Sequence, residues 1–254
     1  FQKKPGSTPL WDNTILSCLF PADTNLQSLL WLLRAQPTTD NDTSLEIQLI
    51  EDKDWERSWM ANFKAMAFGK TLWICPSWQE PPDPNAVNVM LDPGLAFGSG
   101  THATTALCLR WLEQADLMGK HVIDYGCGSG VLAIAASLLG AATIHGVDND
   151  PQAIIATIDN SQRNQISDAR LTTFLPQELP AMEADILLAN ILAEPLIDLA
   201  AKFSTLVKAG GQIVLSGILE NQIDQVLTAY TPQFVMGEPS LEGDWVRLNG
   251  TRLY

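Results

Sequence analysis

Basic residues are scarce in this sequence. Its 254 residues include 15 Lys and Arg against 29 Asp and Glu, so the formal net charge is −14. Binding to a phosphate backbone depends on clustered Lys and Arg, and the composition therefore predicts no direct contact with nucleic acid. The negative charge would attract a basic protein partner. It would equally serve solubility alone, and charge by itself does not separate these two interpretations.

Metal-ligand patterns and membrane spans are also missing. The four cysteines form no CxxC pair, and His102, His121 and His145 stand apart from one another. We therefore predict no metal site and a reducing, cytoplasmic location. The longest apolar run, 131–142, is too short to cross a bilayer, and no signal peptide is visible. These absences predict no membrane contact. The chain starts at Phe1 without an initiating Met, so we expect a fragment.

Apolar residues are plentiful, at 46% of the chain against 17% charged residues, which predicts a sizeable packed core. We divide the chain into an N-terminal unit over 1–50, a linker helix over 51–63 and a larger domain over 64–254. In the first unit, four leucines between positions 26 and 33 follow helical spacing, and apolar residues alternate over 45–49 as in a strand. The unit is therefore expected to be α+β.

Strands and helices alternate from Thr71 onward. The expected strands are Leu72–Ile74, Val87–Leu91, His121–Tyr125, Thr143–Asp148, Arg170–Phe174, Asp185–Asn190 and Gln212–Ser216. The expected helices cover 103–117, 130–139, 151–164, 194–207 and 220–229, and the tail is expected to add antiparallel edge strands. Asp150 and Pro151 are typical of a helix start, and Lys208 with the glycines at 210 and 211 predicts a helix end. The pattern predicts an α/β fold with a doubly wound, mostly parallel seven-stranded sheet.

One glycine-rich loop follows directly from a buried strand. The strand over 121–125 runs into Gly126-Cys127-Gly128-Ser129-Gly130, and an apolar helix follows. Gly126 and Gly128 let the backbone turn tightly and approach a ligand at the carboxyl end of the sheet. A dinucleotide fingerprint needs GxGxxG, but Val131 stands where its third glycine would be. The spacing D-x-G-x-G-x-G instead resembles motif I of class I methyltransferases, which bind S-adenosylmethionine.

Asp148 ends the next strand, where a carboxylate is placed to accept both hydroxyls of an adenosyl ribose. The alternative is an ordinary turn or capping role, because Asn149 and Asp150 share the loop. We predict that Asp150 caps the helix and that Asp148 binds the ribose.

A second glycine-rich segment runs from Asp92 to Thr105 and precedes a helix. Three glycines and a Phe over 94–101 predict a flap able to close over a ligand. Thr101 or Thr104 would cap the helix, and Thr105 in its first turn would meet an anionic carboxylate. The alternative is a connector with capping threonines.

The buried strand Asp185–Asn190 ends in a polar amide. Its place resembles the [DN]-P-P-[YF] element of amine methyltransferases, with Ile191 and Leu192 where the prolines would stand. The alternative is an Asn that merely ends a strand.

Together these three elements resemble the bacterial methyltransferases that modify large-subunit ribosomal protein eleven. So do the segments 51–57 and 72–78, and the resemblance extends from about residue 50 to the C-terminus. Ser99 and Ala103 depart from the residues common in that family, and the N-terminal unit is shorter than the family expects. The resemblance implies that S-adenosylmethionine is bound by Thr105, Gly126, Asp148 and Asn190. We expect Gly128 of the glycine-rich loop to take part in this binding, and we expect the chain to be a monomer.

The resemblance also implies the reaction, which is methyl transfer to the α-amine and Lys side chains of the ribosomal protein, gripped by the N-terminal unit. Such a transfer is an in-line displacement that depends on positioning. Asn190 is the candidate to aim the amine, and no residue is assigned as general base. The alternatives are a methyltransferase for another protein, a small molecule or RNA, a nicotinamide-dependent oxidoreductase, and a non-catalytic binding module.

Overall fold

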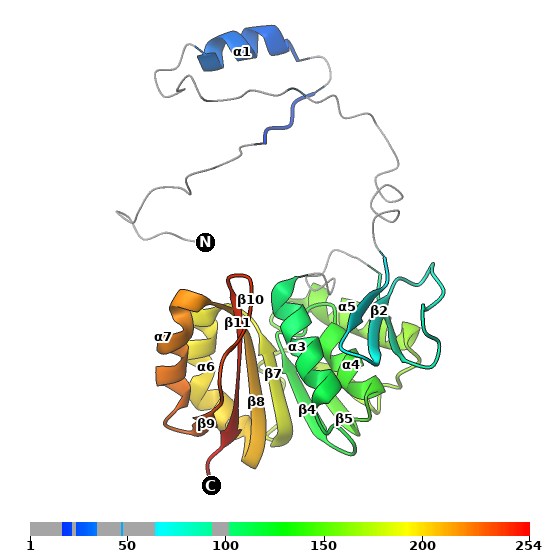
Figure 1. The fold of residues 1–254 in the computed structure, drawn as a ribbon, viewed down its shortest axis with the longest axis vertical. Coiled ribbons are helices and arrows are strands. Elements are labelled where there is room, and N and C mark those ends of the chain that lie inside the picture. The colour runs from blue at the N-terminus through cyan, green and yellow to red at the C-terminus, as the bar shows by residue number, and fades with distance from the viewer. Residues whose placement is uncertain (1–16, 22–23, 35–46, 48–63, 93–101) are drawn as a thin grey trace. The chain divides into compact units, whose positions relative to one another are not determined.

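The computed structural model describes residues 17–21, 24–34, 47, 64–92 and 102–254. The chain divides into two compact units, 1–53 and 54–254 (Figure 1). In the first unit, helix α1 spans Leu26–Arg34 and contains the four predicted leucines. The predicted strand over 45–49, apart from Ile47, and the predicted linker helix over 51–63 lie outside the described residues.

The second unit begins with a small three-stranded sheet. Its strands are β1 (Met66–Phe68), β2 (Leu72–Cys75) and β3 (Val87–Met90). β1 runs antiparallel to β2, and β3 runs parallel to it. Glu113 of a neighbouring helix fixes the turn between β1 and β2, because its Oε1 accepts from the amides of Lys70 and Thr71 at 2.9 and 3.1 Å. The predicted strands 72–74 and 87–91 are therefore confirmed as strands, but they form a sheet of their own.

The central sheet has the strand order β10-β11-β8-β7-β4-β5-β6, with β9 also paired to β11. Five neighbouring strands are parallel: β4 (His121–Tyr125), β5 (Thr143–Val147), β6 (Leu171–Phe174), β7 (Ala184–Asn190) and β8 (Val207–Leu219). Three strands are antiparallel: β9 (Phe234–Met236), β10 (Ser240–Glu242) and β11 (Trp245–Arg252). The mostly parallel, doubly wound sheet is confirmed, with eight strands rather than seven.

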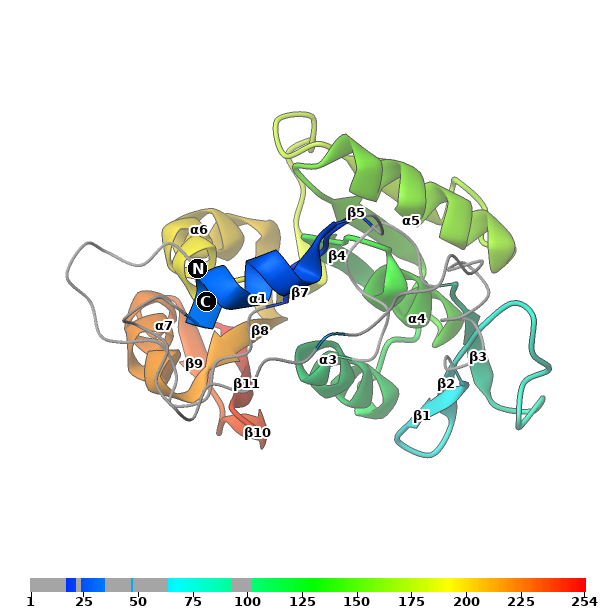
Figure 2. The same cartoon turned by 90° about the horizontal axis from the view of Figure 1, so that it is seen from above.

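Helices cover both faces of this sheet. They are α3 (Ala103–Gln114), α4 (Val131–Leu138), α5 (Pro151–Arg163), α6 (Ala193–Leu206) and α7 (Ile223–Tyr230), the last preceded by a 3₁₀ turn, η1 (Glu220–Gln222). Successive strand residues alternate between two apolar cores: Val122 packs with α3 and α4, whereas Ile123 packs with α6 and α7. Figure 2 shows α3 and α4 together on one side and α6 and α7 together on the other. The central strands are apolar at successive positions, without alternation, because both faces of the sheet are buried.

The predicted helix signals have different outcomes. Asp150 caps α5, since its Oδ1 accepts from the Gln152 amide at 2.9 Å and Pro151 is the first helical residue. The predicted end at Lys208 is wrong, because α6 ends at Leu206 and Val207 is already extended. Lys208 lies in β8 and pairs instead with Asp185 of β7, Nζ to Oδ1 at 2.9 Å. No helix in the described part of the chain is long and apolar enough to cross a membrane.

Candidate functional site

The strand order reverses between β4 and β7. The chain proceeds from β4 to β5 and β6 on one side, then returns to place β7 and β8 on the other. In open α/β sheets, ligands bind outside the carboxyl ends of the strands at such a point. Gly126 follows β4 directly, and Asn190 is the last residue of β7. The sheet therefore brings both predicted elements to one crevice.

The loop after β4 (the glycine loop, residues 126–130) turns over the end of β5. The amides of Gly126 and Cys127 donate to the Val147 carbonyl at 2.6 and 3.1 Å. Three glycines of the loop have positive φ, 83° at Gly126, 54° at Gly128 and 80° at Gly130. Side chains are strained in that region of backbone space. The loop therefore needs glycine at these positions for its shape.

Asp148 lies one residue beyond β5 and joins the glycine loop to it. Its Oδ2 accepts from the Gly128 amide at 2.9 Å, and its Oδ1 accepts from the Asp150 amide at 3.0 Å. An ionised carboxylate has about four acceptor positions, and these two bonds leave acceptor capacity for two ribose hydroxyls. The two carboxylates thus have different roles. Asp150 caps α5 as predicted, whereas Asp148 is bonded to the glycine loop. The ribose role remains a prediction.

Thr105 and Asn190 form the second half of the site. Asn190 Nδ2 donates to Thr105 Oγ1 at 3.3 Å, and Thr105 is only 1% exposed. Ser216 pairs with Asn190 in the β7–β8 register, and its Oγ donates to the Thr104 carbonyl at 3.2 Å. Ser216 thereby fixes the first turn of α3 to the sheet. The sequence had a signal for it, a polar residue inside the apolar run of β8.

His102 caps α3. Its Nδ1 accepts from the Thr104 amide at 3.3 Å, and its ring meets Trp245 edge-on with the centroids 4.8 Å apart. The predicted cap by Thr104 is therefore wrong, because Thr104 is a buried residue of the first helical turn. Thr101 and the predicted flap over 94–101 lie outside the described residues.

Ile191 links the two halves. A Cβ on Gly126 would lie 2.3 Å from Ile191 Cγ2, and a Cβ on Gly217 would lie 2.2 Å from the Ile191 carbonyl oxygen. Both distances are far below van der Waals contact, so only glycine fits on either side. Ile191 is thus packed closely between Gly126 and Gly217, and this packing fixes the backbone just after Asn190. The [DN]-P-P-[YF] element of amine methyltransferases has prolines at this place.

Asp124 lies beneath the glycine loop and is fully buried, with its Oδ2 accepting from the Ala133 amide at 3.0 Å. Its Oδ1 has no hydrogen-bond partner within the described ranges. Burial raises the pKa of this carboxyl to about 7, against the lowering effect of the Ala133 amide. A carboxyl in this state is neutral over part of the physiological range.

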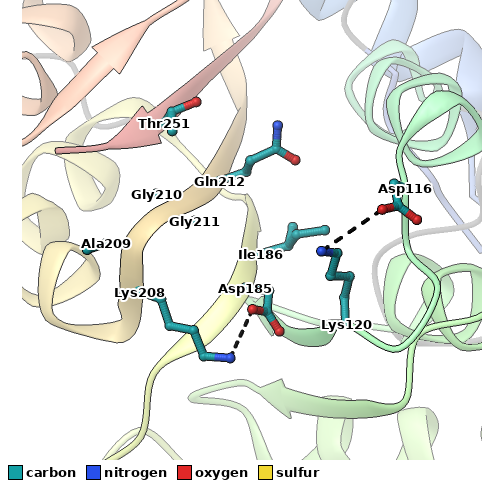
Figure 3. A pocket seen from close by; sticks show the side chains of 10 residues that line it. All are labelled: Asp116, Lys120, Asp185, Ile186, Lys208, Ala209, Gly210, Gly211, Gln212 and Thr251. Carbon is teal, nitrogen blue, oxygen red and sulfur yellow. Dashed lines mark hydrogen bonds and ion pairs between the residues drawn. The ribbon is translucent and has the colours of Figure 1, made fainter. Parts of the chain in front are cut away.

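A separate pocket of about 230 Å³ opens at the amino ends of β4 and β7 (Figure 3). Lys208 and Asp185 pair there at 2.9 Å, and Lys120 lies 4.0 Å from Asp116. The pocket lies at the end of the sheet opposite Asn190, and its charged side chains pair with one another. It therefore does not belong to the site. No cluster of His, Cys, Asp and Glu that could hold a metal ion occurs among the residues whose placement is described.

Comparisons with known proteins agree on one family. The model of the ribosomal protein L11 methyltransferase family (PrmA) matches residues 1–253. A ribosomal protein L11 methyltransferase of Marinobacter nauticus is 53% identical over 255 residues, covering 99% of this chain and 86% of the relative. A crystal structure of ribosomal protein L11 methylase from Lactobacillus delbrueckii subsp. bulgaricus is 32% identical with a TM-score of 0.69, covering 76% of this chain and all of that one. A second solved structure, complexed with SAH, is 13% identical with a TM-score of 0.50, covers 64% of this chain and 52% of that one, and supports the fold alone.

Proposed function

Because the chain belongs to the ribosomal protein L11 methyltransferase family, we propose that it methylates amino groups of ribosomal protein L11 in the cytoplasm, both the α-amine and Lys side chains. It is a protein methyltransferase of the class I fold, and its cofactor is S-adenosylmethionine. The observation that carries the proposal is the meeting of two residue sets at the switch between β4 and β7. One is Asp148 with the glycine loop, and the other is Thr105 with Asn190.

The first set fits the cofactor. Asp148 offers acceptor capacity for the ribose hydroxyls, and its backbone bonds hold it in place before any ligand arrives. Gly126 and Gly128 allow close approach of the backbone because neither carries a Cβ. S-adenosylmethionine bound there supplies an electrophilic methyl group. The chain's contribution is to fix its position relative to Asn190.

The second set orients the amine. Thr105 holds the Nδ2 side of the Asn190 amide, and Oδ1 accepts no hydrogen bond from residues in the described part of the chain. Oδ1 would accept an N–H of the incoming amine and so direct its lone pair. The amine must be neutral, and free amines titrate at about 10.4 for Lys and about 8 for an α-amine. Exclusion of water lowers these values, which assigns deprotonation to burial rather than to a base.

Substrate recognition belongs to the N-terminal region in this proposal. Residues 1–50 would bind the ribosomal protein, 51–63 would link, and 64–254 would carry out the transfer as a monomer. The net charge of −14 favours association with a basic protein. A chain starting at Lys64 should then bind S-adenosylmethionine like the full chain but methylate L11 poorly. Equal methylation by both chains would contradict this division.

The direct test is mass spectrometry of purified L11 after incubation with the full chain and isotopically labelled S-adenosylmethionine. We expect labelled methyl groups on the α-amine and on Lys side chains, in steps of one methyl. The control is Asp148→Ala, which should label L11 far more slowly at the same cofactor concentration. Label on RNA or on a small molecule, with none on L11, would refute the proposal.

A further inference from the structure

Helix α5 holds the backbone of the glycine loop through two side chains one turn apart. Thr157 Oγ1 donates to the Gly128 carbonyl at 3.1 Å, and Asn160 Nδ2 donates to the Ser129 carbonyl at 2.8 Å. In a trans peptide the C=O and N–H groups point in opposite directions. By holding these carbonyls, α5 helps to set the directions of the Ser129 and Gly130 amides.

Arg163 decides which end of the Asn160 amide faces the loop. Asn160 is only 7% exposed, and its Oδ1 accepts from Arg163 Nη1 at 2.6 Å. A guanidinium can only donate, so the contact is made only when the amide oxygen faces Arg163. The amide nitrogen must then face Ser129. The reversed amide would set one oxygen against another.

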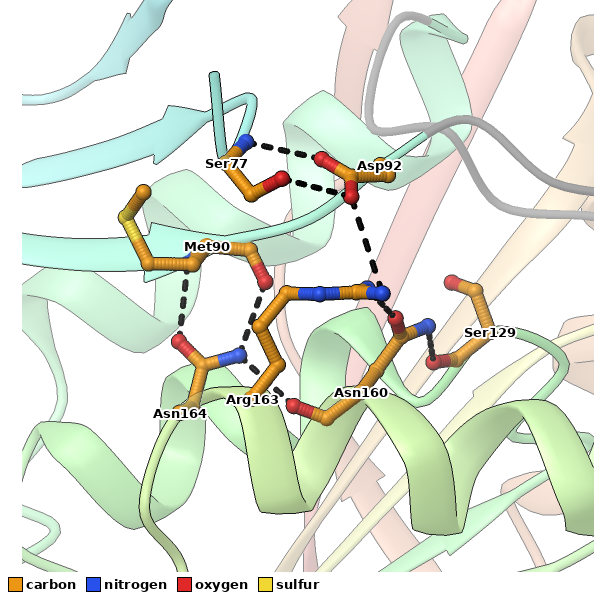
Figure 4. A network of polar contacts seen from close by, with 7 residues as sticks. All are labelled: Ser77, Met90, Asp92, Ser129, Asn160, Arg163 and Asn164. Atoms are coloured by element: carbon orange, nitrogen blue, oxygen red, sulfur yellow. Dashed lines mark hydrogen bonds and ion pairs between the residues drawn. The ribbon is translucent and has the colours of Figure 1, made fainter. Parts of the chain in front are cut away.

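Arg163 is anchored in turn by the small sheet (Figure 4). Its Nη2 lies 3.6 Å from Asp92 Oδ2, just beyond β3. Asp92 is fixed by Ser77, which follows β2: the Ser77 amide donates to Oδ1 and its Oγ donates to Oδ2, both at 2.7 Å. A continuous series of polar contacts therefore runs from the small sheet, through Arg163 and Asn160, to the glycine loop.

We propose that Asn160 is a positioning residue for the cofactor, and that Arg163, anchored by Asp92, acts through it. The inference rests on the proposed cofactor site at the glycine loop. Ser129 lies between two glycines of left-handed backbone, φ 54° and 80°. Glycines give the loop little stiffness of its own, so its shape depends on its internal bond from the Gly130 amide to the Cys127 carbonyl, at 2.7 Å, and on bonds from outside. Asn160 supplies one of them from a rigid helix.

Asn164, the C-cap residue just after α5 and one turn beyond Asn160, provides a matched control. Its side chain binds the Met90 backbone, accepting from the amide at 2.7 Å and donating to the carbonyl at 2.8 Å. It therefore ties the end of α5 to the same small sheet, and its Nδ2 also donates to the Asn160 backbone carbonyl at 2.8 Å, but it does not touch the glycine loop. Removing Asn164 tests general packing of this region, whereas removing Asn160 also tests the loop.

The experiment measures S-adenosylmethionine binding to the full chain by calorimetry, with melting temperature and kcat at saturating cofactor recorded for each variant. Asn160→Ala should raise Kd roughly five- to a hundredfold, because it removes a buried hydrogen bond to the backbone of the glycine loop. Arg163→Met, at a partly exposed position, should raise Kd about three- to tenfold, and Arg163→Lys should restore part of the loss. Asn164→Ala should stay within about twofold of wild type even if it melts earlier.

The double variant Asn160→Ala/Arg163→Met separates the proposed route from independent effects. If Arg163 acts through Asn160, the double variant binds no more weakly than Asn160→Ala alone. Additive losses would overturn that route, and equal losses in Asn160→Ala and Asn164→Ala would reduce the role to packing. If the wild type binds S-adenosylmethionine and the Asn160 and Arg163 variants have the same Kd, this inference is refuted while the proposed cofactor site stands. Absence of wild-type binding would refute the proposed cofactor site with it.

Discussion

Replacing Asp148 tests the cofactor site at its best-defined contact. The carboxylate holds the Gly128 and Asp150 amides, and we expect it also to accept the ribose hydroxyls. A hydrogen bond to a charged group contributes about 1.5–3 kcal/mol, which corresponds to roughly ten- to 150-fold in Kd. Release of the glycine loop adds to the loss. Asp148→Ala should therefore weaken S-adenosylhomocysteine binding at least about tenfold in calorimetry.

The ribose contribution can be separated from the loop contribution with a second ligand. We expect wild type to bind 2′-deoxy-S-adenosylhomocysteine about tenfold or more weakly than the parent compound. Asp148→Ala should bind the two alike, because the acceptor is gone. Asp150→Ala is the matched control in the same loop. It removes the cap of α5, at a cost of about 1 kcal/mol in stability, and should keep the wild-type preference for the hydroxyl.

The outcome that refutes the ribose assignment is specific. If Asp148→Ala still prefers the parent compound by the wild-type factor, the carboxylate does not accept that hydroxyl. Asp148 would then only anchor Gly128, and its removal would weaken the binding of both ligands by the same factor.

Three further substitutions test other parts of the site. Asn190→Ala should lower kcat roughly ten- to a thousandfold, with a smaller change in KM for L11. If this variant binds the cofactor weakly but has a normal kcat at saturating cofactor, Asn190 is a cofactor ligand only. Gly217→Ala should disturb Ile191 and lower kcat more than Gly119→Ala does, since Gly119 shares a positive φ but has no atom within 4 Å of its Cβ position. Equal kcat values would contradict a catalytic role for the packing of Ile191 between Gly126 and Gly217. Folding keeps Asp124 protonated up to about pH 7, whereas its ordinary pKa is 3.8, so wild-type stability falls as pH rises between these values and levels off above them. Urea unfolding should thus show Asp124→Asn gaining on wild type between about pH 5 and about pH 8, by roughly 3 kcal/mol, since about two pH units of the shift lie in this window; a constant difference would mean that the pKa is not raised.

Features that arise from short stretches of chain could be predicted from the sequence. The glycine loop, the cap at Asp150 and the strand ending at Asn190 each depend on neighbours within a few residues. Parallel strands then place all carboxyl ends at one edge, which made the meeting of these segments predictable. The contact between Asn190 and Thr105, 85 positions apart, does not follow from that edge, because Thr105 lies in α3, which follows a strand of the small sheet.

Features that depend on long-range partners could not be predicted. Lys208 lies in a strand because β8 extends along β7 and offers it Asp185 as a partner, while the local pattern favoured a helix end. The strands at 72–75 and 87–90 show the same limit, since alternation identifies a strand but not the sheet it joins. His102 caps α3 because its ring nitrogen reaches the Thr104 amide. Asn160 has its role because it bonds to Ser129, which lies 31 positions away in the glycine loop.

The packing around Ile191 connects the two halves of the site in a way that bears on catalysis. Its side chain contacts Gly126 of the glycine loop, and its carbonyl lies against Gly217 of β8. Asn190, one residue earlier, therefore cannot shift relative to the glycine loop without opening one of these contacts. Methyl transfer depends on the distance and angle between amine and methyl donor, and groups held by separate mobile loops would vary in both. Here the element assigned to the amine and the element assigned to the cofactor are packed against one residue, so that a rigid sheet edge sets their separation.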